Sequence, residues 1–167
     1  ENDMIFINHG IIKVCDYGLS EFYNNSNDNN NRNILTTKYV GKKHYKSPQN
    51  HEEYKPFNPM ANDCWSIGVC LFMLLHFGLI PWDKPCFKKG DCHRHNDNSK
   101  YNLNQLKQQW KDDIYMDNIS YHLLCEIFQR HEHVRYNINE IHDHKYVNDI
   151  SNQINNENNN NNSNPII

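Results

Sequence analysis

Several residues in this 167-residue sequence have side chains that could bind a metal or act in catalysis. Asp16 directly follows an apolar stretch and precedes Gly18 by two positions, so its carboxylate either belongs to an ordinary turn or offers oxygen to a hard cation. A second group, which could bind zinc, consists of Cys86, Cys92, His93 and His95. Its C-x5-C-H-x-H spacing matches no common zinc site, and we interpret it as part of a polar loop.

The elements around Asp16 are predicted to be short and extended. Residues 4–7 and 11–14 are apolar and of β type, and His9-Gly10 between them can reverse the chain, which predicts a β-hairpin leading to Asp16. Residues 24–33 are rich in asparagine and contain too few apolar side chains to offset the entropy lost on ordering. We expect a mobile insert there.

The most apolar part of the chain is residues 64–80, which contain no formal charge. Asn62 or Asp63 can cap the start of a helix there, and Gly78 with Pro81 marks its end. A helix that is apolar all round either crosses a membrane or forms the buried centre of a domain. No Lys/Arg cluster flanks this run, so we favour the buried helix and predict no membrane span.

The rest of the chain is predicted to be helical and then disordered. Amphipathic spacing predicts helices over residues 102–111 and 120–130, separated by a loop from the apolar run. Asn137 and Glu140 have the spacing of a capping box, which predicts a short helix over residues 138–144. From Ser151 to the end the chain is rich in asparagine, and we expect a disordered tail over residues 151–167.

Composition excludes some classes of function. The 17 basic and 20 acidic side chains give a net charge of −3, which argues against nucleic acid as a partner. The mean hydropathy of −0.94 is low, mostly because of the asparagine-rich segments. The six cysteines are scattered, and we interpret them as reduced thiols.

Five short motifs occur in one order and together resemble the C-terminal half of a eukaryotic protein kinase catalytic domain. In sequence order they are Asp16-Tyr17-Gly18 (for DFG), residues 41–49 (for G-T-x-x-Y-x-A-P-E), residues 63–69 (for D-x-W-S-x-G-V), residues 78–82 (for G-x-x-P-F/W), and Leu123-Leu124 followed by Arg135, Glu140 and His144. The wording of residues 62–69, together with the asparagine-rich inserts, is similar to the FIKK family of parasite kinases.

This resemblance implies a mainly α fold, a kinase C-lobe fragment over residues 1–150 with an N-terminal hairpin and a central buried helix. It also implies ATP and Mg²⁺ as cofactors, a protein substrate, and transfer of the γ-phosphate to a hydroxyl, with Ser/Thr expected over Tyr. Localisation is left open between cytoplasmic and exported. A catalytically dead remnant that acts as an interaction module is the alternative.

The resemblance assigns Asp16 as the metal ligand and Gly18 as the flexible residue after it. A second ligand, an Asn in the family, falls on Asn2 or on Asp3 depending on the length of the hairpin. Both side chains offer an oxygen, so both remain candidates.

The resemblance also assigns residues that bind substrate or hold the activation segment. Lys42 replaces the threonine that follows Gly41 in Ser/Thr kinases, although a solvated surface lysine is an equally ordinary interpretation. Gln49 replaces the glutamate that pairs with the arginine at Arg135, and a neutral bond should be weaker by about 1 kcal/mol. Asp63 either caps a helix or accepts hydrogen bonds from the catalytic loop.

The glycine-rich loop, the strand lysine and the catalytic-loop aspartate of a kinase have no counterpart in these 167 residues. We therefore assign no catalytic residue within the chain and expect the fragment alone to be inactive. We expect the protein that contains it to be an active kinase.

Overall fold

The computed structural model describes residues 6–8, 11–22, 35–52, 55–81 and 116–162. The chain divides into two compact units, Glu1–Asn31 and Arg32–Ile167, and each is described here by itself. Several sequence predictions lie outside the described residues: Asn2 and Asp3, the insert over 24–33, the helix over 102–111, and the Cys86, Cys92, His93 and His95 group.

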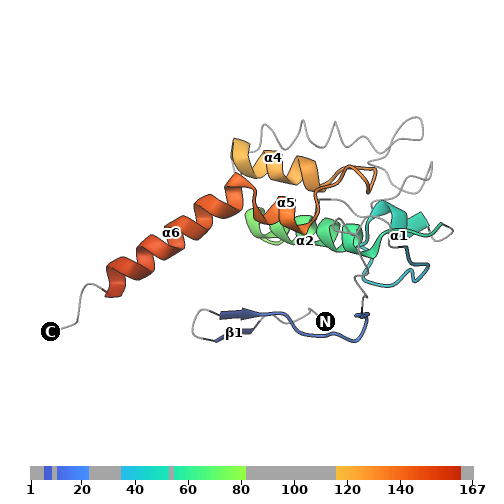
Figure 1. Ribbon diagram of the computed structural model, residues 1–167, viewed down its shortest axis with the longest axis horizontal. Helices are drawn as coiled ribbons and strands as arrows, with labels where there is room; N and C mark the ends of the chain where they lie inside the picture. The colour runs from blue at the N-terminus through green and yellow to red at the C-terminus, as the bar shows by residue number, and fades with distance from the viewer. Residues whose placement is uncertain (1–5, 9–10, 23–34, 53–54, 82–115, 163–167) are drawn as a thin grey trace. The chain divides into compact units, whose positions relative to one another are not determined.

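The smaller unit contains two short strands, β1 (Phe6–Asn8) and β2 (Ile11–Lys13). They pair antiparallel, with Phe6 opposite Lys13 and Asn8 opposite Ile11 (Figure 1). Three residues after β2 the chain reaches Asp16, so the strand places this carboxylate at its own carboxyl end.

The larger unit is built around helix α2 (Pro59–Leu75). Asn58 caps it by accepting hydrogen bonds from the backbone N–H groups of Met60 and Ala61, and Pro59 follows at the first helical position, where its missing N–H costs nothing. The prediction that Asn62 or Asp63 caps this helix is therefore wrong, because both lie inside it. The side chain of Asn62 instead accepts hydrogen bonds from a neighbouring segment.

Helix α2 also ends earlier than the apolar run does. Its last residue is Leu75, and the N–H of Gly78 returns to the carbonyl of Met73 at 2.7 Å. This bond closes a Schellman motif in which Phe77 adopts the left-handed conformation, with φ of 52°. The run over residues 64–80 is therefore a helix followed by a turn.

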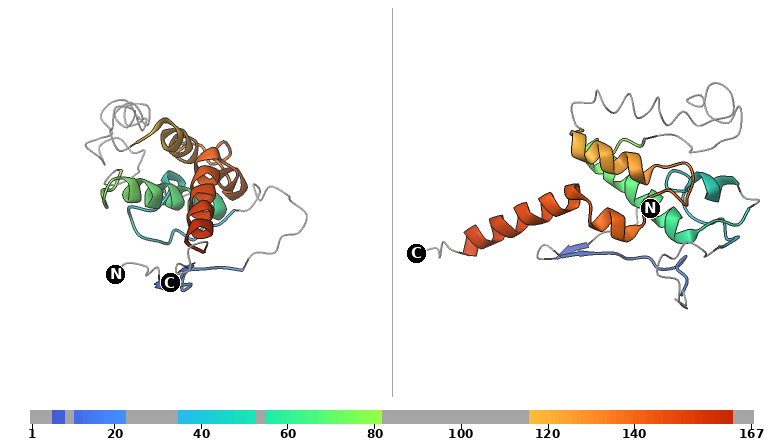
Figure 2. Two further views of the ribbon diagram at one scale, coloured as in Figure 1. Left: turned by 90° about the vertical axis from the view of Figure 1, so that its left-hand side faces the viewer. Right: turned by 45° about the horizontal axis from the view of Figure 1, so that its top comes forward.

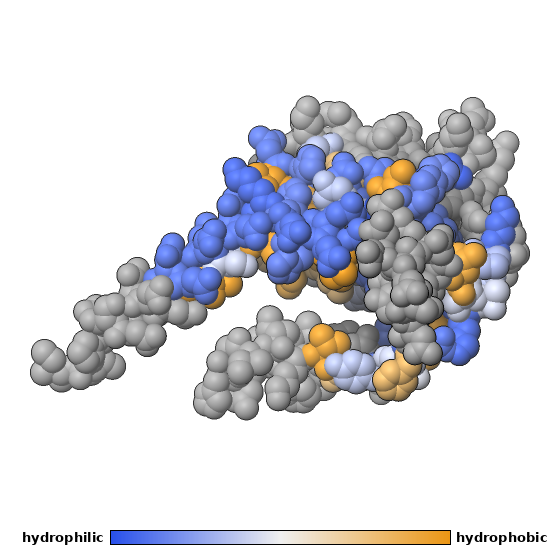
Figure 3. All heavy atoms as spheres, in the orientation of Figure 1, coloured by the Kyte–Doolittle hydropathy of each residue, from blue (hydrophilic) through white to orange (hydrophobic). Residues whose placement is uncertain are grey.

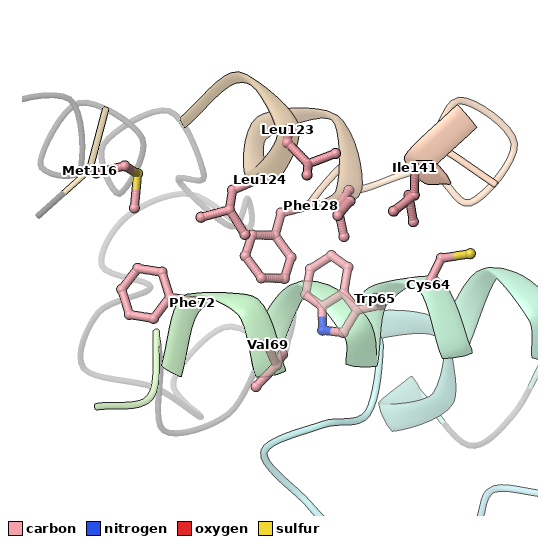
Figure 4. Packing of buried hydrophobic residues seen from close by; sticks show 10 residues of the cluster. Cys64, Trp65, Val69, Phe72, Met116, Leu123, Leu124, Phe128 and Ile141 are labelled. Carbon is pink, nitrogen blue, oxygen red and sulfur yellow. The ribbon is translucent and has the colours of Figure 1, made fainter. Parts of the chain in front are cut away.

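One face of α2 packs against helix α4 (Asn118–Ile127), which lies alongside it in both Figure 1 and Figure 2. The aromatic rings of Trp65 and Phe128 meet edge to face at the centre of this interface, with ring centroids 5.0 Å apart (Figure 4). Gly68 lies beside them, and a Cβ atom there would come within 2.4 Å of Ile127 Cγ2. The two helices approach closely because residue 68 has no side chain.

The opposite face of α2 carries exposed apolar side chains. Leu74 is 80% exposed and Ile67 is 38% exposed, whereas Trp65 and Val69 are completely buried. The apolar run is thus the central helix of the core, but it is buried on one side. None of the helices that the structure describes combines the length and hydrophobicity that a membrane span needs.

Helix α5 (Ile138–His142) begins with the predicted capping box, and this prediction is confirmed. The Asn137 side chain accepts from the N–H of Glu140 at 3.0 Å, and the Glu140 carboxylate accepts from the N–H of Asn137 at 2.8 Å. Ile141 from this short helix closes the core.

Helix α6 (Lys145–Asn162) runs into the segment for which the sequence predicts a disordered tail. Tyr146 and Val147 in its first turn pack against the core, and adding residues to a helix that has already started is far less costly than nucleating one. This explains why asparagine-rich residues continue the helix. The surface over α5 and the start of α6 is mainly hydrophilic in Figure 3.

Candidate functional site

Asp16 lies in the smaller unit, just beyond β2, with its side chain exposed. Its φ of 63° places it in the left-handed region, which Asp and Asn tolerate better than other residues with a Cβ atom. The carboxylate atom Oδ1 accepts a hydrogen bond from the N–H of Gly18 at 3.3 Å. The hydroxyl of Tyr17 donates to the carbonyl of Val14 at 2.9 Å, which fixes the ring of Tyr17 over the strand end.

Asp16 is thus an exposed carboxylate on a turn of the backbone. A carboxylate oxygen is the ligand type that Mg²⁺ prefers, so Asp16 fits one position of such a site. Within the ranges that the structure covers, no group of three His, Cys, Asp or Glu residues could hold a metal ion by itself. Further oxygen ligands would therefore have to come from outside those ranges, where Asn2 and Asp3 lie, or from a bound nucleotide.

Two further predicted site residues, Lys42 and Gln49, belong to the larger unit, in the loop of residues 41–46 and in helix α1 (Pro48–Glu52) that follows it. The loop opens at Gly41, whose φ of 105° is a conformation that L side chains rarely adopt. The N–H of Tyr45 donates to the carbonyl of Lys42 at 3.0 Å, which closes a turn. Lys42 and Lys43 are exposed on this turn.

Neutral side chains fasten this loop to α2. The Asn62 atom Oδ1 accepts from the N–H of Ser47 at 2.9 Å and from the amide of Asn50 at 3.2 Å. The same Asn50 amide donates to the carbonyl of Val40 at 2.9 Å, and the Ser66 hydroxyl donates to the carbonyl of Tyr45 at 2.9 Å. The sequence does not mark Asn50 or Ser66 as site residues, and it indicates Asn62 only as a possible helix cap.

Gln49 and Arg135 lie together, 86 residues apart in the sequence. The Arg135 atom Nη2 donates to Gln49 Oε1 at 3.1 Å. The amide nitrogen of Gln49 in turn donates to the carbonyl of Arg130, a bond that the sequence did not suggest. Gln49 is therefore an acceptor for one partner and a donor for another, which a glutamate in its place could not be.

Arg135 is the most deeply buried charge in the described part of the chain, with 3% of its surface exposed. It also donates to the carbonyls of Ala61 and Gln129, each at 2.9 Å, and its guanidinium lies 4.8 Å from the centre of the Trp65 ring. Burial lowers the pKa of Arg135 to about 10, and Glu132 partly counteracts that effect. The arginine joins α1, α2 and the end of α4.

Asp63 lies in the second turn of α2 with part of its side chain exposed. Desolvation by the surrounding protein raises the pKa of this carboxyl, while a hydrogen bond with the Asn62 side chain lowers it. A carboxylate whose charge is incompletely compensated is suited to accept N–H donors from another segment.

Comparison with known proteins identifies one family. The profile of the protein kinase domain matches residues 1–147. The chain is 34% identical over 83 residues to a CBL-interacting protein kinase 9 from Oryza sativa subsp. japonica, a stretch that is 50% of this chain and 17% of that protein.

Two yeast proteins are similar over nearly the same share of the chain. The probable serine/threonine-protein kinase KKQ8 of Saccharomyces cerevisiae is 27% identical over 48% of this chain and 11% of its own length. The probable serine/threonine-protein kinase HAL5-like of Kluyveromyces lactis is 26% identical over 45% of this chain and 10% of its own length. In each case the match spans less than a fifth of the relative.

Proposed function

Because the chain belongs to the protein kinase family, we propose that it forms the C-terminal lobe of a kinase that transfers the γ-phosphate of ATP to Ser or Thr hydroxyls of a protein. The names of the relatives, two of which are serine/threonine-protein kinases, support the choice of acceptor. The observation that carries the proposal is the geometry of Asp16, an exposed carboxylate held in a left-handed turn at the end of a strand.

The backbone of Asp16 supports a functional role for it. A non-glycine residue with positive φ costs about 1–2 kcal/mol, and such strain occurs at functional sites as well as in turns. Asp16 would hold Mg²⁺, with Asn2 or Asp3 as the second ligand, and the ion would neutralise charge on the ATP phosphates. Gly18 supplies the N–H that orients the carboxylate.

The loop of residues 41–46 is proposed to bind the protein substrate, with Lys42 in the place of the family's threonine. A lysine cannot accept a hydrogen bond, so it would contact a carboxylate or a phosphate. The Gln49–Arg135 contact then ties this loop to the end of the lobe, and Asp63 would accept hydrogen bonds from the catalytic loop.

The narrower kinship with FIKK-type kinases is also a proposal, supported by the Asn62-Asp63-x-Trp65-Ser66 wording and the asparagine-rich segments. The competing function is a dead kinase remnant that binds partners. Lys42 and Gln49 favour it, because both depart from the residues that active kinases carry at these positions.

A phosphotransfer assay on the full-length gene product tests the proposal. The protein is incubated with Mg²⁺ and γ-labelled ATP, and the label is traced to Ser, Thr or Tyr by phosphoamino-acid analysis. The replacement Asp16→Asn keeps the size of the side chain and removes its charge, and we expect it to lower kcat by at least about a hundredfold, because metal-held charge neutralisation carries most of the catalysis.

Asp143→Asn is the matched control. Asp143 is an exposed carboxylate at the end of α5 that pairs with His142, and its loss should leave kcat unchanged. Equal activity of the unsubstituted protein and the Asp16→Asn variant would contradict the assigned role of Asp16. No transfer by the unsubstituted protein would favour the remnant instead.

A further inference from the structure

Two uncharged side chains, Asn50 and Asn62, anchor the backbone on either side of the loop of residues 41–46, and the Lys46 ammonium adds a hydrogen bond to the carbonyl of Tyr39 at 2.9 Å. Before the loop, the carbonyl of Val40 accepts from Asn50; after it, the N–H of Ser47 donates to Asn62. The Asn50 amide also donates to the Asn62 oxygen at 3.2 Å, so these two asparagines form one connected unit.

This unit is buried where it meets the backbone. Ser47 and Asn50 are each 1% exposed, and the Ser47 hydroxyl accepts from the Asn50 N–H at 3.4 Å. A buried N–H group without an acceptor costs about 1–3 kcal/mol, so the Ser47 N–H depends on Asn62 for its partner. Asn62 does not cap α2, because Asn58 does, and besides these contacts its side chain is hydrogen-bonded to Asp63.

We infer that Asn62 is a positioning residue of the proposed kinase, which fixes the loop of residues 41–46 on α2 in the conformation that receives the protein substrate. This inference rests on the proposed function for the role of the loop. Ser66 assists from the next turn of α2, through its bond to the carbonyl of Tyr45.

The chemistry of this anchor makes a distinctive prediction. The two bonds that the Asn62 oxygen accepts come from a backbone N–H and a neutral amide, so their strength should depend little on salt concentration, in contrast to a surface ion pair. Removing the Asn62 oxygen should loosen the loop without altering the smaller unit that carries Asp16.

Two variants separate the oxygen from the rest of the side chain. Asn62→Leu keeps approximately the same volume and removes the acceptor, whereas Asn62→Asp keeps an acceptor oxygen for both donors. Both variants remove the amide that is hydrogen-bonded to Asp63, and Asn62→Asp places a second carboxylate beside it, so the comparison between the two variants reports the acceptor oxygen. Asn148→Leu is the matched control, since the Asn148 amide is exposed and donates to the carbonyl of Asp143 on another face of the unit.

The first measurement is hydrogen exchange of the Ser47 amide in the 167-residue chain. We expect Asn62→Leu to speed this exchange at least about tenfold while the amides inside α4 keep their rates, and Asn62→Asp and Asn148→Leu to leave the Ser47 amide protected. An unchanged Ser47 rate in Asn62→Leu would overturn the inference, as would equal loss of protection throughout α4.

The second measurement is steady-state kinetics of the full-length gene product. Asn62→Leu should raise KM for the protein substrate about tenfold and leave KM for ATP unchanged, and Asn62→Asp should restore the substrate KM. A parallel rise in both KM values would overturn the positioning role. If the unsubstituted protein transfers no phosphate, the proposed function fails, and the exchange experiment still decides whether Asn62 fixes the loop.

Discussion

Replacing Gln49 with glutamate gives the buried guanidinium of Arg135 the counter-charge that it lacks at this contact. Burial lowers the pKa of Arg135 from its ordinary value of 12.5 to about 10. One pKa unit corresponds to about 1.4 kcal/mol, so the uncompensated desolvation of this side chain amounts to about 3 kcal/mol. Gln49 offers it a neutral oxygen at 3.1 Å.

Two effects of Gln49→Glu oppose each other at neutral pH. The bond from Arg135 becomes charge-assisted and gains about 1 kcal/mol. The amide N–H that Gln49 donates to the carbonyl of Arg130 is lost, which costs about 1 kcal/mol. We therefore expect the free energy of unfolding at neutral pH to change by less than about 1 kcal/mol.

The pH dependence of the stability of Gln49→Glu reports the contribution of the introduced negative charge. The introduced carboxyl has a pKa near 4.3 in the unfolded chain, and Arg135 lowers it in the folded chain. Its stabilising contribution is therefore present above about pH 4.3 and is lost as the pH falls through the lower, folded pKa. The protonated carboxyl carries an O–H that can donate to the Arg130 carbonyl in place of the amide, so acidification restores part of that bond and reduces the net loss.

Urea denaturation of the 167-residue chain at about pH 7 and about pH 3 measures this difference. Relative to the unsubstituted chain, Gln49→Glu should lose up to about 1 kcal/mol on acidification. Gln129→Glu is the control, because the Gln129 amide lies 3.4 Å from the Glu126 carboxylate and the new charge should be unfavourable at neutral pH. If Gln49→Glu shows the same relative stability at both pH values, Arg135 does not act on this position.

Three further outcomes follow from the packing and the backbone. Gly68→Ala should destabilise the chain by about 1–3 kcal/mol in urea denaturation, because the new Cβ would lie 2.4 Å from Ile127 Cγ2; unchanged stability would disprove the close helix contact. Phe77→Gly should raise stability by about 1 kcal/mol in a thermal melt, because φ is 52° there and the ring is 82% exposed; a lower Tm would contradict this. Desolvation is the larger cause and the nearby His122 the smaller cause of a lowered pKa of His144, below its ordinary value of 6.5. As the pH falls, His144 therefore takes up its proton at a higher pH in the unfolded chain than in the folded chain. The contribution of His144 is thus complete above about pH 6.5 and is lost at lower pH, and His144→Gln should flatten the pH dependence of stability between about pH 7 and pH 5.

The sequence predicted the elements that are set by local patterns. The capping box at Asn137 and Glu140 needs only residues three apart, and the structure contains it. The start of α2 was misplaced because Asn58, Asn62 and Asp63 are all good capping residues, and only Pro59 directly after Asn58 favours the first of them. The run of asparagines after Ser151 was assigned to a tail because composition does not report a helix that begins upstream.

The sequence indicates which residues belong to the candidate site, but it does not indicate most of the hydrogen bonds that they form. Gln49 and Arg135 could be paired from the family resemblance, and they lie within hydrogen-bonding distance. The second bond of Gln49, to the Arg130 carbonyl, depends on where the chain turns after α4, which no spacing in the sequence encodes. The Asn50–Asn62 contact was missed for a similar reason, since two asparagines among so many carry no distinguishing signal.

The central claim is that the carboxylate of Asp16 binds the metal of a metal–ATP complex. Electron paramagnetic resonance of Mn²⁺, used in place of Mg²⁺, measures this directly in the full-length gene product with a non-hydrolysable ATP analogue. The account predicts nucleotide-dependent Mn²⁺ binding that Asp16→Asn weakens at least about tenfold, because one of the few charged oxygen ligands is removed. Equal Mn²⁺ affinity in the two proteins would contradict it.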